Sequence, residues 1–445
     1  MKVAPSQREM YVIRHSQRAW IAYAPLHSRL LLIESTAGNQ ILSGEMAALE
    51  DSLRQVLTNE LDSRVRMSRE AEATNAESFI PRTLAISLSL NCNLRCVYCH
   101  ASAAPKELDT LTNWDTIQVA IDYFLNFPHH QEHGIVSLSF AGGGEPTLEW
   151  QLLTQATRYF KEQASVRGLE AEVTMATNGT MTKEQTDFVI REFRGVSLSI
   201  DGDEEIHNSH RPAVGFNSFE ATMRTAKQLS QEQFPFGVHA VVSAQSVERM
   251  PGIVDFFVDE LPGLAGIGFE PVVPLGRAEG TVLQPSLSRF TDLWLEARRR
   301  GLQRGVRVFY SGGCQIDSIR PLFCSAVMGP DITITWDGHV SSCTRDNPDA
   351  HFRVGIVDAI KGEVRIDMTA VKRLKTEIIE RREKCTRCFA VYHCGGECAD
   401  LIYRTSVDRC RHTRRIVYAQ LCEFLGIKPA RFAPRATRVL LKEIP

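Results

Sequence analysis

Residues 91–100 read Asn-Cys-Asn-Leu-Arg-Cys-Val-Tyr-Cys-His and place Cys92, Cys96 and Cys99 in one short stretch. Three thiolates are too few to close a four-ligand zinc site or to saturate a four-iron cluster, which takes four cysteines. A metal bound by them keeps one coordination position open for chemistry. Cysteines two or three residues apart also occur in structural zinc knuckles, so the spacing by itself leaves a zinc site as an alternative.

The residues before this stretch favour the catalytic alternative. Residues 83–90 alternate apolar and small polar side chains, which predicts a β-strand. The cysteines therefore follow the carboxyl end of a strand, which is where barrel enzymes keep their active sites.

The chain has 445 residues, of which 43% are apolar and 23% charged, as in a soluble globular protein of two or three domains. Its formal net charge of −2 gives no global field that would attract nucleic acid or an anionic membrane. No stretch reads as a membrane span or a secretion signal. Twelve cysteines in such a chain indicate metal ligation or redox chemistry, and we expect a cytoplasmic protein without nucleic-acid or membrane partners.

From residue 84 onward, apolar strands alternate with amphipathic helices, which is typical of a parallel sheet covered by helices. After the first strand, the expected strands cover residues 135–141, 172–177, 196–201, 237–243 and 267–273. The expected helices cover residues 114–127, 148–166, 183–193, 219–229 and 289–304. Thr182 and Gln185 have the spacing of a capping box. Six such βα units predict an α/β fold with an open partial (β/α)6 barrel.

The barrel is expected to occupy residues 81–306, between two smaller regions. Residues 1–80 predict a small α+β module and linker, in which residues 18–24 and 29–34 form a hairpin that a helix follows. This module is either a structural cap on the barrel or a docking surface that offers a strand edge to a peptide. Residues 307–445 predict a cysteine-rich C-terminal domain.

A glycine-rich turn, Gly142-Gly143-Gly144-Glu145-Pro146, follows the second barrel strand. Glycines let the backbone approach a ligand closely, and the Glu145 carboxylate can accept a hydrogen bond from an ammonium group. Beside this turn, the cysteine stretch resembles the Cys-x3-Cys-x2-Cys loop of the radical SAM enzymes, and the turn resembles their Gly-Gly-Glu-Pro motif. The resemblance covers roughly residues 84–290.

The resemblance implies a [4Fe-4S] cluster held by Cys92, Cys96 and Cys99, whose open iron chelates the amino and carboxylate groups of S-adenosylmethionine. One electron then splits this cofactor into methionine and a 5'-deoxyadenosyl radical. The cofactor supplies the difficult chemistry, and the protein supplies position.

Contacts to the cofactor are implied for several residues outside the cluster. Ser199 on the fourth strand and Arg211, twelve residues later, match a serine and an arginine that hold the ribose hydroxyls and the carboxylate in peptide-modifying members. A hydroxyl both donates and accepts, and a guanidinium offers a fork to a carboxylate. Tyr98 corresponds to an aromatic residue that packs on the adenine. The full implied set is Tyr98, Gly143, Gly144, Glu145, Ser199 and Arg211.

The cysteines of the C-terminal region follow a second pattern. Thirteen residues lie between Cys324 and Gly338, and four lie between Gly338 and Cys343. A Cys-x2-Cys-x5-Cys-x3-Cys run starts at Cys385, and Cys410 follows after a gap. The pattern resembles the seven-cysteine SPASM domain of radical SAM enzymes that mature peptides and proteins. Zinc ribbons are the alternative interpretation of paired cysteines.

The SPASM resemblance implies two auxiliary [4Fe-4S] clusters, and so three clusters in the chain. The ligands implied for one are Cys324, Cys343 and Cys398, with the upstream Cys314 as the fourth; those for the other are Cys385, Cys388, Cys394 and Cys410. Cys422 is left over in a helix-like segment, and we expect it to be a buried apolar residue.

One position departs from a known branch of this family. Members that oxidise a sulfatase serine or cysteine to formylglycine carry an aspartate directly after the cysteine that matches Cys343, and Thr344 occupies that place here. The formylglycine reaction therefore loses support. Asp346 lies nearby but two residues too late to match, so it is a candidate base and the identity of any base stays open.

We therefore expect an enzyme that modifies a ribosomal precursor peptide by an intramolecular carbon–sulfur or carbon–carbon crosslink. The N-terminal module would help to dock the peptide leader, and a carrier such as flavodoxin or ferredoxin would supply electrons. The alternatives are a formylglycine-forming maturase, a small-molecule radical SAM dehydrogenase and a non-catalytic iron–sulfur electron-transfer protein. Reductive cleavage of S-adenosylmethionine separates the enzymes from the electron carrier.

Overall fold

The computed structural model describes residues 8–25, 29–53, 81–103, 111–312, 319, 323, 331–345, 351–385, 387–398, 400, 409–430 and 436–441. The chain divides into two compact units, each assembled from separate stretches of sequence. One unit, here called the barrel unit, comprises residues 78–311 and 325–374. The other, the terminal unit, comprises residues 1–77, 312–324 and 375–445.

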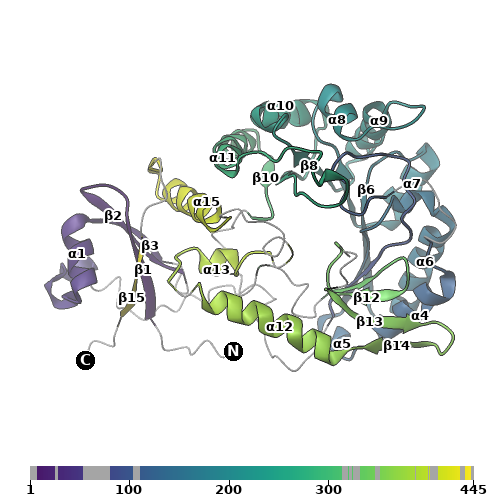
Figure 1. Cartoon of the computed structure of the whole chain (residues 1–445), viewed down its shortest axis with the longest axis horizontal. Helices are drawn as coiled ribbons and strands as arrows, with labels where there is room; N and C mark the ends of the chain where they lie inside the picture. Colours follow the sequence, from purple (N-terminus) through teal and green to yellow (C-terminus); the bar gives the residue numbers. More distant parts are fainter. Residues whose placement is uncertain are drawn as a thin grey trace. The chain divides into compact units, whose positions relative to one another are not determined.

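The barrel unit is built on an eleven-stranded sheet (Figure 1). The spatial order is β10-β9-β8-β7-β6-β5-β4-β11-β12-β13-β14. The parallel strands are β4 (Thr83–Ile86), β5 (Ile135–Phe140), β6 (Glu170–Thr177), β7 (Gly195–Ser199), β8 (Phe236–Val242), β9 (Gly266–Pro271), β10 (Arg307–Phe309) and β11 (Asp331–Ile334). The antiparallel extension is β12 (His339–Ser341), β13 (Arg353–Asp358) and β14 (Glu363–Ile366). The six expected strands are confirmed, and β10 and β11 lengthen the parallel sheet on either side of them.

Helices connect the parallel strands of the barrel unit and bury an apolar stripe. In α4, for example, Ile117, Ile121 and Phe124 recur at helical spacing and are all buried. The expected capping box is confirmed at the start of α7, where Thr182 and Gln185 each accept from the backbone N–H of the other. The helices are α4 (Trp114–Leu125), α5 (His130–His133), α6 (Trp150–Val166), α7 (Lys183–Glu192), α8 (Glu204–His210), α9 (Ser218–Gln231), α10 (Met250–Glu260) and α11 (Leu287–Gln303), with 3-10 turns η3 (Pro146–Leu148), η4 (Val247–Arg249) and η5 (Gly276–Ala278).

The two faces of the parallel sheet carry different side chains. Val136, Leu138 and Phe140 of β5 point to one face and are each 0% exposed, because they pack beneath the helices. The alternate residues point to the other face, here called the inner face, and are half-exposed and mostly small or polar. The register of the strands places on it Ser137, Ser139, Thr174, Ser197, Ser199, Gly237 and His239, with Ile135, Glu170 and Glu172 toward the amino ends of β5 and β6. The inner face therefore offers hydrogen-bonding groups and little bulk.

The terminal unit holds a four-stranded antiparallel sheet in the order β15-β1-β2-β3. The expected hairpin is confirmed as the pair β2 (Ala19–Ala24) and β3 (Arg29–Glu34), and α1 (Ser35–Ser43) follows it. Two strands were not expected: β1 (Arg8–Arg14) and β15 (Ala436–Leu441), which pair with each other. Segments from both ends of the sequence thus build one sheet.

Both faces of this second sheet are covered. Met10 and Val12 of β1 pack in a core that includes Ile41 of α1. The alternate residue Tyr11 packs on the other face in a core with Cys422, which is 0% exposed, as expected for an apolar cysteine. The remaining elements are η2 (Met46–Ala48), α12 (Met368–Glu383), α13 (Val391–Cys394) and α15 (Arg409–Phe424). Over the described ranges, no helix is long and apolar enough to cross a bilayer.

Candidate active site

The loop with the first three cysteines follows β4, at the carboxyl end of the parallel sheet. Its backbone is hydrogen-bonded to the end of α8 and the segment after it: Arg95 N–H donates to the carbonyl of Pro212 (2.8 Å), and Val97 N–H donates to that of His210 (2.9 Å). The Arg95 guanidinium also donates to the carbonyl of Cys92 (3.1 Å), which closes the loop on itself. The loop is therefore held in shape by hydrogen bonds of its own chain.

A second brace comes from the turn η5, after β9. Nε of Arg277 donates to the carbonyl of Cys96 (2.9 Å), and Nη1 donates to that of Ala103 (2.7 Å). The neighbouring Gly276 has a φ of +54°, and a Cβ there would lie 2.4 Å from the carbonyl oxygen of Cys99, so only glycine fits. The hydrogen bond between Arg277 and Cys96 joins residues that are 181 positions apart in the sequence.

The thiols of this loop are half-buried and lie close enough to affect one another. Burial raises the pKa of Cys92 to about 12. Burial also raises the pKa of Cys96, although the nearby Arg211 guanidinium lowers it. Binding of iron would require thiolates and would release these protons.

The arrangement of the three thiols also bears on the kind of metal centre. Among the described side chains, no three of the types His, Cys, Asp and Glu are placed to hold a single metal ion. In a four-iron cluster each iron takes one thiolate, so Cys92, Cys96 and Cys99 could each ligate one iron and leave the fourth iron open.

Glu145 is buried, and its carboxylate is used inside the protein. Oε1 accepts from the N–H (3.1 Å) and hydroxyl (2.7 Å) of Thr147 and from the hydroxyl of Thr177 (2.7 Å). Oε2 accepts from the N–H of Asn178 (2.7 Å). Burial raises the pKa of Glu145, and these hydrogen bonds lower it, but the pKa stays above its usual value. Glu145 thus fastens the glycine-rich turn to the end of β6, and its acceptance of a cofactor ammonium stays a prediction.

The glycine-rich turn packs against the cysteine loop backbone to backbone. Gly144 N–H donates to the carbonyl of Ser89 (2.7 Å), and Glu145 N–H donates to that of Asn91 (2.7 Å). A Cβ on Gly144 would lie 2.0 Å from the carbonyl oxygen of Asn91, and one on Gly143 would lie 2.4 Å from that of Ser89. Only glycine permits this approach.

The turn after β6 reaches the first cysteine. Nδ2 of Asn178 lies 4.0 Å from Sγ of Cys92 and donates to Oδ1 of Asn93 (2.8 Å). Nδ2 of Asn93 donates in turn to the hydroxyl of Thr180 (2.9 Å). Three loops that follow neighbouring strands therefore converge on Cys92.

Arg211 and Asp201, which are buried, form a network with the half-buried Tyr98 beside the cysteine loop. Nη2 of Arg211 donates to Oδ1 of Asp201 (3.0 Å), and the Tyr98 hydroxyl donates to Oδ2. The guanidinium also lies over the Tyr98 ring, 5.3 Å from its centroid. Burial alone would raise the pKa of Asp201, but Arg211 and His210 hold it well below its usual range. Tyr98 and Arg211 are thus engaged with an ionised carboxylate, and their cofactor contacts stay predictions.

Ser199 is the last residue of β7 and points to the inner face. It is half-exposed, and its hydroxyl makes no hydrogen bond with the part of the chain that the structure describes. The group is therefore available to a ligand, which the predicted ribose contact requires.

The second set of cysteines is divided between the two units. Cys343 follows β12 in the barrel unit, where its N–H donates to the hydroxyl of Ser341 (3.2 Å). In the terminal unit, the thiols of Cys385, Cys388 and Cys410 lie close enough that each of the first two has its pKa raised by Cys410 as well as by burial. Three of the four ligands predicted for one auxiliary cluster are thus neighbours. Cys394 and Cys398 are half-buried in the same unit, and Cys314, Cys324 and Asp346 lie outside the described residues.

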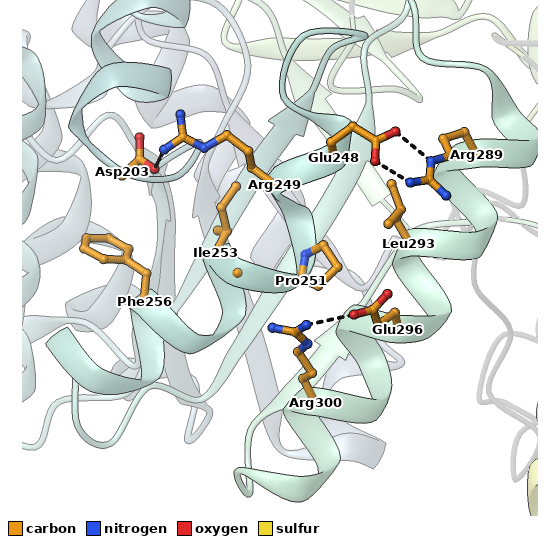
Figure 2. A pocket seen from close by; sticks show the side chains of 11 residues that line it. Asp203, Glu248, Arg249, Pro251, Ile253, Phe256, Arg289, Leu293, Glu296 and Arg300 are labelled. Carbon is orange, nitrogen blue, oxygen red and sulfur yellow. Dashed lines mark hydrogen bonds and ion pairs between the residues drawn. The ribbon is translucent and has the colours of Figure 1, made fainter.

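A pocket of about 560 Å³ is lined by η4, α10, α11 and Asp203, the residue before α8. Figure 2 shows its side chains. Its lining residues belong to the helices that cover the sheet. Its charged side chains neutralise each other, in the pairs Arg249–Asp203, Arg289–Glu248 and Arg300–Glu296. We assign no ligand to it, because it shares no residue with the loops around the cysteines.

Residues 86–257 match the model of the Radical SAM superfamily. The chain carries a radical SAM domain. It is similar to the Fe-coproporphyrin III synthase of Methanosarcina barkeri, with 28% identity over 225 residues, 49% of this chain and 52% of that protein.

Two maturation proteins are also similar to the radical SAM domain. A cysteine-type anaerobic sulfatase-maturating enzyme of Clostridium perfringens is 25% identical over 178 residues, 39% of this chain and 47% of that protein. The sporulation killing factor maturation protein SkfB of Bacillus subtilis is 25% identical over 185 residues, 40% of each. The chain spans about half the length of these curated relatives.

The fold has a counterpart among solved structures. Native anSMEcpe with bound AdoMet superposes with a TM-score of 0.59 and 19% identity over 78% of this chain and 100% of that one. The likeness supports the radical SAM barrel as the fold of the barrel unit.

Two residues of the site, Asp201 and Arg277, were missed from the sequence. Asp201 lies two residues after the end of β7, and a carboxylate at the carboxyl end of a strand was a signal that could have found it. Asn178 directly follows β6, in a turn whose sequence predicts either a tight turn or a polar contact to the cofactor. Arg277 had no such signal, because its two partners lie in a loop far away in the sequence.

Proposed function

We propose that this chain is a radical SAM maturase that modifies a ribosomal precursor peptide. In this reaction a 5'-deoxyadenosyl radical, made by reductive cleavage of S-adenosylmethionine, removes a side-chain hydrogen, and an intramolecular thioether or carbon–carbon crosslink forms. The observation that carries the proposal is that the cysteine loop, the glycine-rich turn and Ser199 all lie at the carboxyl ends of parallel strands, β4, β5 and β7. The Ser199 hydroxyl has no hydrogen-bond partner among the described residues.

Cleavage of S-adenosylmethionine is the first test. The anaerobic, reduced protein should produce 5'-deoxyadenosine, and replacement of Cys92, Cys96 and Cys99 by alanine should abolish it. The matched control is Cys422→Ser, because that buried thiol has no proposed metal. An iron–sulfur electron carrier would produce no 5'-deoxyadenosine, and retained cleavage in the triple variant would reject the assignment of this loop.

The number of clusters is a second part of the proposal. Three [4Fe-4S] clusters require about twelve irons and a similar amount of sulfide per chain. The neighbouring thiols of Cys385, Cys388 and Cys410 support one auxiliary cluster. Anaerobic reconstitution followed by iron, sulfide and zinc analysis decides the count; about four irons with about two zincs would support the zinc-ribbon alternative instead.

A peptide substrate is supported by the maturation proteins among the relatives. The formylglycine alternative is weakened by Thr344, because a threonine hydroxyl is no base at neutral pH. The similarity to the Fe-coproporphyrin III synthase supports the small-molecule alternative. The predicted set of eight C-terminal cysteine ligands argues against it.

The edge strand β3 is the proposed docking place for the peptide leader. It lies at the end of the sheet order, and no described strand pairs with its outer side. Leu32 on this strand is 46% exposed, and an unpaired edge next to an apolar side chain can accept an added strand. Leu32→Asp should weaken leader binding at least about tenfold, whereas Leu42→Asp, at a 38% exposed residue of α1, should not. Equal effects of both would reject this docking place.

The substrate itself can be found by co-expression with small open reading frames encoded beside this chain, followed by mass spectrometry. A peptide lighter by about two mass units per modification, and resistant to proteolysis across a ring, supports the crosslink, since one hydrogen leaves each joined atom. A gain of one oxygen, inverted stereochemistry at constant mass, or turnover of a small molecule only would reject it. A reduced flavodoxin or ferredoxin is the proposed electron donor, and a cytoplasmic location would provide such a carrier and reduced thiols.

A further inference from the structure

His239 lies in the middle of β8 and points to the inner face, in register with Ser199 on β7 and Gly268 on β9. Because Gly268 has no side chain, two rings occupy the space above it. A Cβ there would lie 3.2 Å from Cδ2 of His239 and 2.7 Å from Cε2 of Phe309. The imidazole is half-buried and makes no hydrogen bond with any described residue, so its ring nitrogens are free to meet a ligand.

Four charged groups on the elements around His239 lie close enough to shift the pKa of its imidazole. Burial lowers the pKa of the imidazole, and Arg211 and Arg345 lower it further. Glu270 on β9 and Asp201 after β7 raise it, but the pKa remains below its ordinary value. The side chain is therefore a neutral imidazole at pH 7, with a nitrogen lone pair that can accept a proton.

Closure of a crosslink needs a proton acceptor. When the 5'-deoxyadenosyl radical takes a hydrogen atom from a substrate carbon, 5'-deoxyadenosine forms and a carbon radical remains. Bond formation to a second atom, a thiol sulfur or another carbon, breaks the bond between that atom and its hydrogen. One proton and one electron must then leave, and an oxidised auxiliary iron–sulfur cluster, if bound by the C-terminal cysteines, would accept the electron.

We propose that His239 accepts this proton, an assignment that rests on the proposed crosslinking function. His239 lies one strand from Ser199, where the cofactor ribose is expected, and so beside the place where the carbon radical would form. Thr344, at the position where formylglycine-forming relatives carry a base, has no group that takes a proton at neutral pH. Among the inner-face residues of β5 to β8, His239 is the titratable side chain level with Ser199, whereas Glu170 and Glu172 of β6 lie nearer the amino ends of the strands.

The test measures how much modified peptide forms per 5'-deoxyadenosine between pH 5.5 and 8.5, with the peptide that co-expression identifies. In the wild type the ratio should fall as the pH drops through the pKa of the imidazole. In His239→Gln it should be about a hundredfold lower and lose this acid limb, while deuterium still passes from the labelled peptide to 5'-deoxyadenosine. His133→Gln, at an exposed residue of α5, should behave as the wild type.

A second variant changes only the charge that faces the ring. Glu270 raises the pKa of His239, so Glu270→Gln should move the acid limb to lower pH without removing it. A purely structural role would not predict this shift, and the variant keeps the test open if His239→Gln does not fold.

A third measurement does not depend on turnover. Diethyl pyrocarbonate reacts with accessible neutral imidazoles, and mass spectrometry of digested holoprotein locates the label. His239 should react and be protected by the peptide together with S-adenosylmethionine. His207, which is 0% exposed, should stay unlabelled.

The outcomes separate the two proposals. An unchanged ratio and pH profile in His239→Gln, or an unreactive His239, overturns the assignment while the crosslinking function stands. Loss of 5'-deoxyadenosine formation in the variant also overturns it, because the residue would then serve cofactor binding. A wild type that cleaves S-adenosylmethionine but modifies no peptide overturns the crosslinking function and the assignment with it.

Discussion

Nη2 of Arg211 donates a 3.0 Å hydrogen bond to Oδ1 of Asp201, and the two residues are 6% and 1% exposed. The pair joins the end of β7 to the residue after α8, whose neighbours hold the backbone of the cysteine loop. A guanidinium predicted to bind the cofactor carboxylate thus already neutralises a buried carboxylate of the protein. Its structural and cofactor roles have to be separated by experiment.

Arg211→Ala should lower the free energy of unfolding by about 3 to 5 kcal/mol, because it leaves the Asp201 carboxylate buried without its cation. Adding Asp201→Asn should recover part of this loss, measured by urea denaturation as a double-mutant cycle. Additive effects would show that the two side chains are not coupled.

The double variant also tests the cofactor contact. If Arg211 binds the carboxylate of S-adenosylmethionine, affinity in the refolded, reconstituted double variant should still be about ten- to a hundredfold weaker than in Asp201→Asn alone. Equal affinities, measured by calorimetry, would assign Arg211 a purely structural role.

Gly144→Ala should prevent assembly of the cluster site, because its methyl group would lie 2.0 Å from the carbonyl oxygen of Asn91. We expect little iron after anaerobic reconstitution, with helix content by circular dichroism unchanged. Gly252→Ala is the matched control: it lies within α10 with open space around it and should be neutral or stabilising by up to about 1 kcal/mol. Full iron incorporation in Gly144→Ala would contradict the close packing of turn and loop.

Arg277→Met should make the cysteine loop lose its metal faster, because two carbonyls of the loop lose their donors at a cost of about 1 to 3 kcal/mol each. The rate of iron release to a chelator measures this effect. Arg299→Met removes an exposed arginine of α11 that has no partner among the described residues, and it should release iron at the wild-type rate. An unchanged rate in Arg277→Met would show that the brace is dispensable.

His207 should make stability depend on pH. It is 0% exposed, and burial lowers its pKa to about 3. The unfolded state binds the proton from about pH 6.5 downward and the folded state does not, so stability falls as the pH drops through this window. Between pH 7 and pH 5 the loss from this group is about 2 kcal/mol.

His207→Leu, which cannot be protonated, should lose about 2 kcal/mol less than the wild type over that interval in urea denaturation. His133→Gln, at an exposed residue, should keep the wild-type dependence. A pH dependence unchanged by His207→Leu would mean that the buried imidazole is protonated in the folded state.

The sequence by itself determined the parallel strands β4 to β9, the helices between them and the glycine-rich turn after β5. These follow from local patterns: the spacing of apolar residues and the steric freedom of Gly143 and Gly144 act between near neighbours in the chain. The motif formed by the three cysteines of the first loop is also a local pattern, because its spacing can be recognised without reference to any distant residue.

The tertiary structure alone decided which distant groups meet. Three contacts are examples: β15 pairs with β1, Arg277 donates to the cysteine loop, and Arg211 donates to Asp201. Nothing in a single sequence indicates that the two segments of each contact will meet. The orientation of His239 depends on a gap left by Gly268 on the neighbouring strand. Such contacts depend on the register of the sheet and the exit angle of each loop, and those arise only when the whole core packs.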